Sequence, residues 1–472
     1  MIEKILNNET YKQKIVPIAL FLVVELMFLL AFNLGDLGIA YRLIAFVLAL
    51  ILLPTFLKTL NDDIARGFIF VFLPLVIYLL SVTFSPVFSI QEGLIPSQSV
   101  TLLNRGFFQL LATFVGAISF LFLGYFVSRT NLLSKYNFIF LIFGGIATLL
   151  LISMLATLVN YGFFHRIVYA GQVNYYEASP YPIATQANLL MGFSIATVHH
   201  HILVTMGLVV ASPAFALIFY RDFIDRKYIY FLITFAIIGL LSVVLLTSFI
   251  HLVFLLPALL IALMIKFNVH KMKYFKTAVL SILGFIVLLV FIGVLASFEV
   301  EFIVNIIKSN PISNRLFYNG YTARYMGIIK ESLDFNYIFG NPFNLTEVEP
   351  VFTTFPSGNI LLDMVRETGL IGGIAFLAFL VVAIKIAIDY INSDKDGAIV
   401  KYMILAFLVT LFARYMFYYP FNQLSYVDSY WSVNYFPFVE SKEFAISLFL
   451  IGYMYIAKTA SKPKLEEVKN HE

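Results

Sequence analysis

The residues best suited to chemistry in water lie between Arg315 and Gly373, in a polar stretch that leads into an apolar helix. Four basic residues occur in this stretch, and three of them are arginines: Arg315, Arg324, Lys330 and Arg366. A guanidinium is planar and permanently charged, so it can donate two parallel hydrogen bonds to a single phosphate or carboxylate group. This stretch is therefore expected to bind an anion.

The composition indicates which class of protein carries these arginines. Hydrophobic residues make up 61% of the sequence and charged residues 12%, and the mean hydropathy is +0.91. Soluble domains are about 45–50% apolar and about 25% charged, so these values predict a polytopic membrane protein. The sequence contains no cysteine, which excludes disulfides, thiolate metal sites and a cysteine nucleophile.

The apolar runs predict an all-α fold built in the membrane. A helix needs about 20 apolar residues to cross a bilayer, and the chain contains twelve such runs, which we expect to form one integral domain over residues 1–472. The first run is interpreted as a membrane span and not as a cleaved signal, because it is long and contains Glu25. The predicted spans lie near 15–34, 38–57, 67–84, 107–127, 138–159, 201–220, 228–246, 249–266, 277–297, 370–388, 402–418 and 443–458.

Two connections between the predicted spans are much longer than the usual length of about 2–8 residues, and long connections of this kind tend to be functional. The larger one covers residues 298–369 and precedes the tenth span. The smaller one covers residues 160–200, of which 188–200 is expected to be re-entrant or interfacial. Shortly after it, Pro213 predicts a kink in the sixth span.

The distribution of basic residues predicts the orientation of the chain. Twelve spans place both termini on one side, and the loops and ends of that side carry 21 of the 31 basic residues, so the positive-inside rule makes it cytoplasmic. That side has 17 lysines and 4 arginines, whereas the outer side has 3 lysines and 7 arginines. Topology depends on charge and not on the kind of basic residue, so the outer arginines taken together indicate anion binding there: Arg42, Arg105, Arg166, Arg315, Arg324, Arg366 and Arg414. The alternative for any single one of them is that it snorkels or pairs with a carboxylate of an outer loop.

The end of the 298–369 connection has a helical pattern. Asn359, Asp363, Arg366 and Glu367 fall within an arc of roughly 100° on a helix, and apolar residues cover the rest of its surface. We expect an amphipathic helix at the membrane surface that ends at Gly369 as the C′ residue. Its polar arc forms either one wall of a cleft or an ordinary pattern of surface charge.

Two short motifs accompany this pattern. Arg324 lies fifteen residues before Phe339-Gly340-Asn341-Pro342, and a second motif consists of Asn359, Leu362, Glu367, Gly369, Leu370, Ile371 and Gly372. In this order and register the sequence resembles the O-antigen ligase/polymerase superfamily of membrane glycosyltransferases, in particular the Wzy-type polysaccharide polymerases. The resemblance covers roughly residues 315–376 directly, and the rest of the chain only through the number of spans and the layout of the loops.

The sequence departs from that family at two places. Gly358 stands where the ligases usually carry a histidine, and Thr247-Ser248-Phe249-Ile250 lacks the arginine of a Ser-Arg pair that begins a middle span in the family. The missing histidine favours a polymerase over a ligase. It also leaves the catalytic base without an assignment.

The resemblance implies an activity, a location and a set of partners. A polymerase of this kind transfers a growing glycan from undecaprenyl diphosphate onto a hydroxyl of another lipid-linked repeat, at the outer face of a bacterial inner or plasma membrane. Its partners would be the undecaprenyl-diphosphate-linked oligosaccharide, the lipid bilayer, a chain-length regulator and a flippase, and no nucleic acid is expected. We expect no cofactor and no metal, because the outer side has no D-x-D or H-E-x-x-H pattern and arginines can stabilise a leaving diphosphate.

The predicted site residues follow from these roles. The base must accept the proton of the acceptor hydroxyl, and we predict Glu177 for this role, with Asp363 as the second candidate. The residues predicted to contact the diphosphates or the rest of the substrate are Arg166, Arg315, Arg324, Arg366, Arg414 and Asn359.

Two alternative functions remain at this point. One is an O-antigen ligase-like glycosyltransferase, and the other is a transporter or flippase for the same lipid-linked oligosaccharide. Transporters usually place polar and charged groups at mid-membrane depth around broken helices. Such groups are few inside the predicted spans here and crowd the outer loops, which favours an enzyme. A non-catalytic assembly subunit would leave the excess of outer arginines unexplained.

Overall fold

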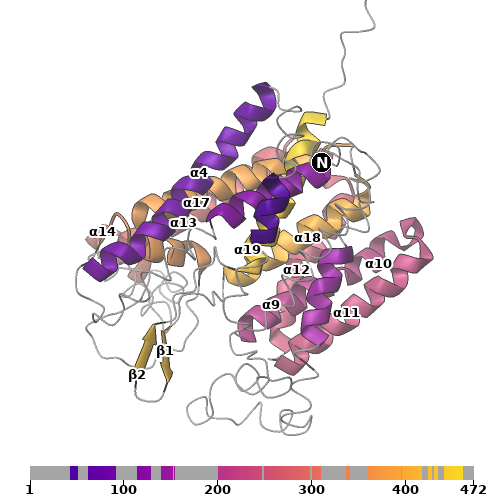
Figure 1. Cartoon of the computed structure of the whole chain (residues 1–472), viewed down its shortest axis with the longest axis horizontal. Coiled ribbons are helices and arrows are strands. Elements are labelled where there is room, and N and C mark those ends of the chain that lie inside the picture. Colours follow the sequence, from indigo (N-terminus) through magenta and orange to yellow (C-terminus); the bar gives the residue numbers. More distant parts are fainter. Residues whose placement is uncertain are drawn as a thin grey trace, which may run out of the picture.

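Helices make up most of the described structure (Figure 1). The computed structural model describes residues 43–50, 62–91, 114–128, 140–151, 154, 200–246, 249–297, 300–309, 336–340, 359–394, 396–416, 424–427, 430–433 and 441–460. The helices that carry no label in Figure 1 cover 43–50, Phe114–Ser128 and Phe140–Leu151. The labelled helices are α4 (Asp62–Gln91), α9 (His200–Ala211), α10 (Ala214–Tyr220), α11 (Arg226–Leu246), α12 (Leu256–Lys266), α13 (Phe275–Ser297), α14 (Glu301–Ser309), α17 (Ile360–Ile391), α18 (Ala398–Tyr415) and α19 (Lys442–Ala460).

Three stretches of the described helices are long and apolar enough to cross a membrane: Val204–Phe223, Ile360–Ile391 and Ala398–Tyr415. Eleven of the twelve predicted spans overlap a described helix, whereas the first one, 15–34, lies outside the described residues. Pro213 lies between the end of α9 and the start of α10, so the helix is interrupted at the position where the kink was predicted. Short 3₁₀ helices continue the chain at η4 (Arg221–Phe223), η5 (Phe249–Leu255) and η6 (Val269–Lys271).

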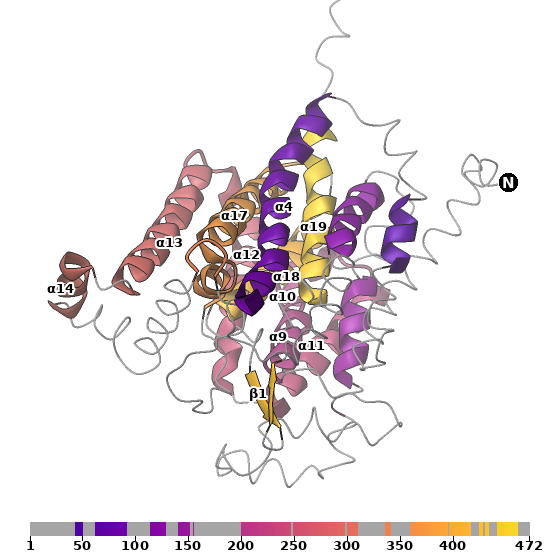
Figure 2. The same cartoon turned by 60° about the vertical axis from the view of Figure 1, so that its left-hand side comes forward.

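The long helices α4 and α17 pack side by side in opposite directions (Figure 2). Ser85 of α4 contacts Glu367 near the start of α17, and Tyr78, two turns earlier in α4, packs against Phe376, further along α17. On the other flank, α19 approaches the helix Phe114–Ser128 so closely that a Cβ at Gly452 would lie 2.1 Å from Leu121 O. These contacts join α4 to α17 and the middle of α19 to the helix Phe114–Ser128.

A hairpin of two short strands lies between α18 and α19 and was not part of the predicted all-α fold. Strand β1 (Leu424–Val427) pairs antiparallel with β2 (Tyr430–Val433), and Leu424 lies opposite Val433. Strands of four residues are too short to give a clear alternating pattern in the sequence. Their aromatic and β-branched residues nevertheless favour extended backbone.

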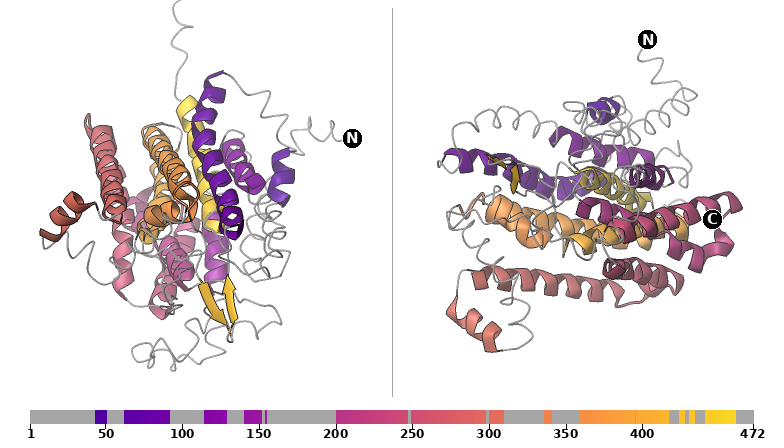
Figure 3. Two further views of the ribbon diagram at one scale, coloured as in Figure 1. Left: turned by 90° about the vertical axis from the view of Figure 1, so that its left-hand side faces the viewer. Right: turned by 90° about the horizontal axis from the view of Figure 1, so that it is seen from below.

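Helices α13 and α14 lie at the edge of the structure (Figure 3). α13 contacts α17, but several of its large apolar side chains are exposed, among them Ile282 and Phe285. α14 begins four residues after α13 ends and is amphipathic: Ile307 is buried, whereas Phe302 is 71% exposed and Ile306 is 51% exposed. Both helices therefore present an apolar surface that no described part of the chain covers.

Candidate functional site

The candidate site begins at the cap of α17. Asn359 is extended (φ −136°, ψ 117°), and its side-chain oxygen accepts hydrogen bonds from Leu361 N at 2.9 Å and Leu362 N at 3.3 Å. These bonds satisfy backbone N–H groups that have no partner inside the helix. The sequence placed Asn359 on a polar arc that touches substrate. The structure shows it as the N-cap, and substrate contact stays a prediction.

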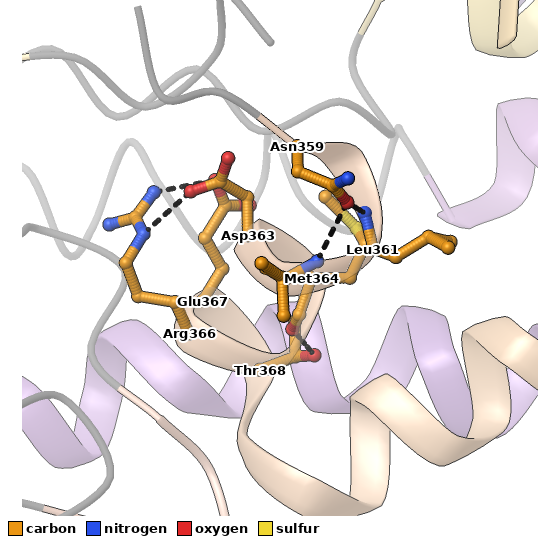
Figure 4. A network of polar contacts seen from close by, with 8 residues as sticks. Asn359, Leu361, Asp363, Met364, Arg366, Glu367 and Thr368 are labelled. Atoms are coloured by element: carbon orange, nitrogen blue, oxygen red, sulfur yellow. Dashed lines mark hydrogen bonds and ion pairs between the residues drawn. The ribbon is translucent and has the colours of Figure 1, made fainter. Parts of the chain in front are cut away.

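One turn into α17, Arg366 forms a buried ionic cluster with Asp363 and Glu367 (Figure 4). Its Nε donates to Asp363 Oδ1 over 3.0 Å, and its Nη2 donates to Glu367 Oε1 over 3.0 Å. All three residues are at most 2% exposed. Burial of ions is costly unless they are paired and hydrogen-bonded, so the two carboxylates and the guanidinium fix one another's orientation.

This turn of helix differs from the amphipathic surface helix that was expected over 359–369. Its apolar residues Ile360 and Met364 are buried, and the charged residues of the polar arc are buried as well. A helix on a membrane surface would expose its polar side to water. The charges can be buried here because they pair with one another, which a helical projection of the sequence does not show.

A tight turn at Asn336–Gly340 packs against the same helix. The side-chain oxygen of Asn336 accepts hydrogen bonds from Ile338 N at 3.1 Å and Phe339 N at 3.0 Å, which closes the turn. Tyr337 O then accepts a hydrogen bond from Leu370 N over 2.9 Å. The turn that carries Phe339-Gly340 is thus bound directly to the segment that carries Glu367 and Gly369.

Gly369 divides α17 into two segments. Its backbone is in a region that L-residues rarely adopt (φ 66°, ψ −167°), so 360–368 and 370–391 run in different directions. Tyr78 of α4 contacts both segments: its hydroxyl donates to Met364 Sδ at 2.7 Å, and its ring lies 4.9 Å from the ring of Phe376. The predicted helix end at Gly369 is confirmed as this kink, which holds the charged turn against α4.

A second buried polar cluster lies where α9, η5, α18 and α19 meet. Arg414 is fully buried in the last turn of α18, and its guanidinium carbon lies 5.0 Å from the centre of the Phe254 ring. The Tyr415 hydroxyl donates to Glu443 Oε1 over 3.5 Å and also interacts with the side chain of Thr205. Tyr415, Glu443 and Thr205 are each at most 2% exposed. This cluster therefore joins a cation and an anion across four segments of the chain.

The first turn of α19 connects the two clusters. Glu443 belongs to the second cluster, and the next residue, Phe444, packs edge-on against Tyr78, with 6.3 Å between the ring centres. Tyr78 in turn contacts Met364, in the turn that carries Asp363 and Arg366. The two arginine clusters thus lie in the same half of the helices, separated by a few packed side chains.

The opposite half of the helices holds polar contacts that connect α17 to α18. The Tyr390 hydroxyl donates to Asp396 Oδ2 over 2.6 Å, and Lys401 Nζ donates to Ile391 O over 3.0 Å and to Ser393 O. Backbone carbonyls at the end of a helix lack partners inside the helix, and Lys401 satisfies one of them. These contacts shape the turn between two helices, and we assign them no chemistry.

The predicted site residues are therefore only partly placed. Asn359, Asp363, Arg366 and Arg414 lie in the described structure, where Arg366 and Arg414 occupy separate clusters. Glu177 and three of the arginines fall outside the described residues: Arg166, Arg315 and Arg324. Within the described residues, no group of three or more His, Asp or Glu side chains is arranged to hold a metal ion.

Two residues of the site were missed by the sequence reasoning. Glu443 lies at the start of an apolar run, where its charge resembles an ordinary helix-end carboxylate. Tyr415 was one of many tyrosines near predicted span ends. Only their contact with each other, across 28 positions of sequence, distinguishes them. An ionisable residue close to the end of a predicted span was the signal that could have selected Glu443.

No protein-family model matches this sequence, and no curated protein matches it either. The two clusters and the motifs that the structure brings into contact are therefore the features that bear on the function.

Proposed function

We propose that this chain is a membrane glycosyltransferase that polymerises lipid-diphosphate-linked glycan at the outer face of a bacterial inner or plasma membrane. The observation that carries the proposal is the contact between the turn Asn336–Gly340 and the charged turn of α17. This contact unites the two motifs through which the sequence resembles the polysaccharide polymerases. The same turn of α17 carries a buried Asp–Arg–Glu cluster, which an ordinary membrane helix would not contain.

The proposed reaction assigns a role to each group. The hydroxyl oxygen of the acceptor sugar attacks the anomeric carbon of the donor glycan, the bond from that carbon to the diphosphate oxygen breaks, and the lipid diphosphate leaves. A carboxylate accepts the hydroxyl proton. Asp363 is the described candidate for this base, since Arg366 holds its carboxylate in one orientation.

The arginines supply the charge that such a leaving group needs. A diphosphate gains negative charge as the glycosidic bond breaks, and preorganised guanidinium groups stabilise it. In the structure, Arg366 is already paired with two carboxylates, so we assign it to orienting Asp363 and Glu367. The contacts to the diphosphates are then assigned to Arg166, Arg315 and Arg324, which lie outside the described residues.

The topology is part of the same proposal. Twelve spans with both termini in the cytoplasm place the starts of α17 and α19 and the end of α18 on the outer side, in agreement with the packing of these helices. The long connection 298–369 then lies outside the cell membrane. It precedes the tenth span and carries both motifs.

A flippase for the same lipid-linked oligosaccharide is the second candidate function. It is favoured by the breaks at Pro213 and Gly369 and by the buried charges beside Gly369, because transporters place such groups around interrupted helices. We prefer the enzyme for two reasons. The resemblance is to glycosyltransferases, and the outer arginines are suited to stabilising the diphosphate that leaves during glycan transfer.

The experiment compares surface glycan in a strain that lacks this gene with the same strain carrying wild-type or variant protein. A polymerase predicts single repeats on the surface of the deletion strain, and a long ladder after complementation with wild type but not with Arg324→Ala. Lysine at this position should also fail, because it lacks the planar fork of arginine. Lipid-linked repeats trapped on the inner side would contradict the enzyme and identify a flippase.

A further inference from the structure

The cluster around Arg414 has no role in the proposed reaction so far, although it buries two opposite charges. Both charges are favoured by the helix ends at which they stand. Arg414 is in the last turn of α18, where carbonyl groups attract a cation, and Glu443 is in the first turn of α19, where N–H groups attract an anion. An arginine and a glutamate thus stand at complementary helix ends inside a protein that is otherwise strongly apolar.

The surroundings of Arg414 hold its guanidinium in place. The ring of Phe254 lies 5.0 Å from its central carbon, within the range of a cation–π contact, and His251 packs nearly parallel to the same ring. On the side of α19, the adjacent residue Tyr415 is hydrogen-bonded to Glu443. Movement of Glu443 would thus disturb the end of α18 directly.

The same turn of α19 reaches the other cluster. Phe444 contacts Tyr78, and Tyr78 is bonded to Met364, within the turn that holds Asp363 and Arg366. We infer that Glu443 is a positioning residue: with Tyr415 it fixes Arg414, and through the first turn of α19 it sets the spacing between the Arg414 and Arg366 clusters. This inference rests on the proposed function and adds α18 and α19 to the transfer site.

The two clusters differ in what they can contribute to the proposed reaction. One cluster contains the candidate base, and the other contains a buried guanidinium at the end of a helix. A fixed spacing between them would align the acceptor hydroxyl with the donor carbon, because effective transfer requires reacting atoms held close together in the correct orientation. Glu443 then affects the rate at saturating substrate more than the apparent KM.

The test uses full-length protein in proteoliposomes and lipid-linked repeats extracted from the deletion strain. Glu443→Gln keeps the shape of the side chain and removes its charge, and we expect kcat to fall by at least about tenfold, with a smaller change in KM. Glu443→Asp should restore most of the rate. Arg414→Gln should also slow transfer, and the double variant should be no slower than Arg414→Gln alone, since Glu443 acts through Arg414.

Controls separate the inference from the proposed function. Glu301→Gln changes an exposed carboxylate of α14 and should leave kcat unchanged. If Glu443→Gln fails to fold, Tyr415→Phe takes its place as the test. This variant removes only the hydroxyl that contacts Glu443, and it should slow transfer. If the two losses of rate multiply in the double variant, or if Glu443→Gln is as fast as wild type, the positioning role is wrong and the proposed function stands. Wild-type protein that forms no polymer would overturn the proposed function and this inference with it.

Discussion

Gly340 and Gly369 face each other with positive φ angles of 71° and 66°, and neither position has room for a side chain. A Cβ on Gly340 would lie 2.5 Å from Gly369 N, and a Cβ on Gly369 would lie 2.1 Å from Ile338 O. The pair is where the turn 336–340 meets the kink of α17, so it fixes the position of the charged turn beside it.

Alanine at Gly369 should therefore separate these two segments. A positive φ costs an L-residue about 1–3 kcal/mol, and the overlap with Ile338 O adds to this cost. We expect Gly369→Ala to lower the midpoint of thermal unfolding in detergent and to abolish polymer. The matched control is Gly284→Ala in α13, where a Cβ would meet no atom within 4 Å. Equal behaviour of the two variants would show that the contact is unimportant.

The buried cluster predicts a strong dependence on Arg366. Arg366→Ala leaves two buried carboxylates without their shared cation, and loss of one partner from a buried ion pair costs about 3–5 kcal/mol. We expect this variant to be poorly folded, as measured by size-exclusion chromatography in detergent. Arg366→Lys should fold better but lose activity, because one ammonium cannot reproduce the fork that contacts both carboxylates. A fully active lysine variant would show that only the charge matters.

The kink and the break in the helices could be predicted from the sequence, whereas the ionic cluster could not. Gly369 and Pro213 can be recognised in the sequence because the backbone preference of a glycine or a proline is a local property of that residue. Burial of Arg366 depends on which segments cover it, and Glu443 acquires its meaning only from Tyr415, on another helix. The hairpin was not predicted for a similar reason, because its short strands are stabilised by pairing with each other.

Helix α14 should lie at the membrane–water interface. It follows a 23-residue apolar helix, and Phe302 and Ile306 are exposed one turn apart, while Glu301 and Lys308 provide a polar side. The chain has one tryptophan, so Phe302→Trp can be placed in a Trp431→Phe background. Its fluorescence should be shifted to the blue and quenched by lipids brominated on the acyl chains. Emission that is typical of water, or a blue shift without quenching, would mean that water or protein covers this face.

The stability of the chain should depend on pH through His270, between α12 and α13. Burial lowers the pKa of His270 below its ordinary value of 6.5, the charges of Lys271 and Lys401 lower it further, and the carbonyl of Met264 opposes them. The folded state thus favours neutral histidine. Its stabilising effect is complete above a pH of about 6.5 and is lost as the pH falls, because the unfolded chain then binds the proton more readily.

The variant His270→Gln tests this pH dependence. Its unfolding temperature in detergent should fall less than that of wild type when the pH is lowered from about 7.5 to about 5.5. At the higher pH, any difference between the unfolding temperatures of the two proteins reflects only how the side chain at position 270 packs. Parallel curves for the two proteins would mean that other groups cause the acid sensitivity.

A polymerase must itself join lipid-linked repeats. The most direct measurement is to incubate the purified full-length protein, in proteoliposomes, with lipid-linked single repeats and to determine the length of the products. We expect a ladder of longer lipid-linked glycans with wild type and only single repeats with Arg324→Ala. Single repeats with both proteins, together with movement of the repeats across the bilayer by wild type, would show that the chain is a transporter and not a polymerase.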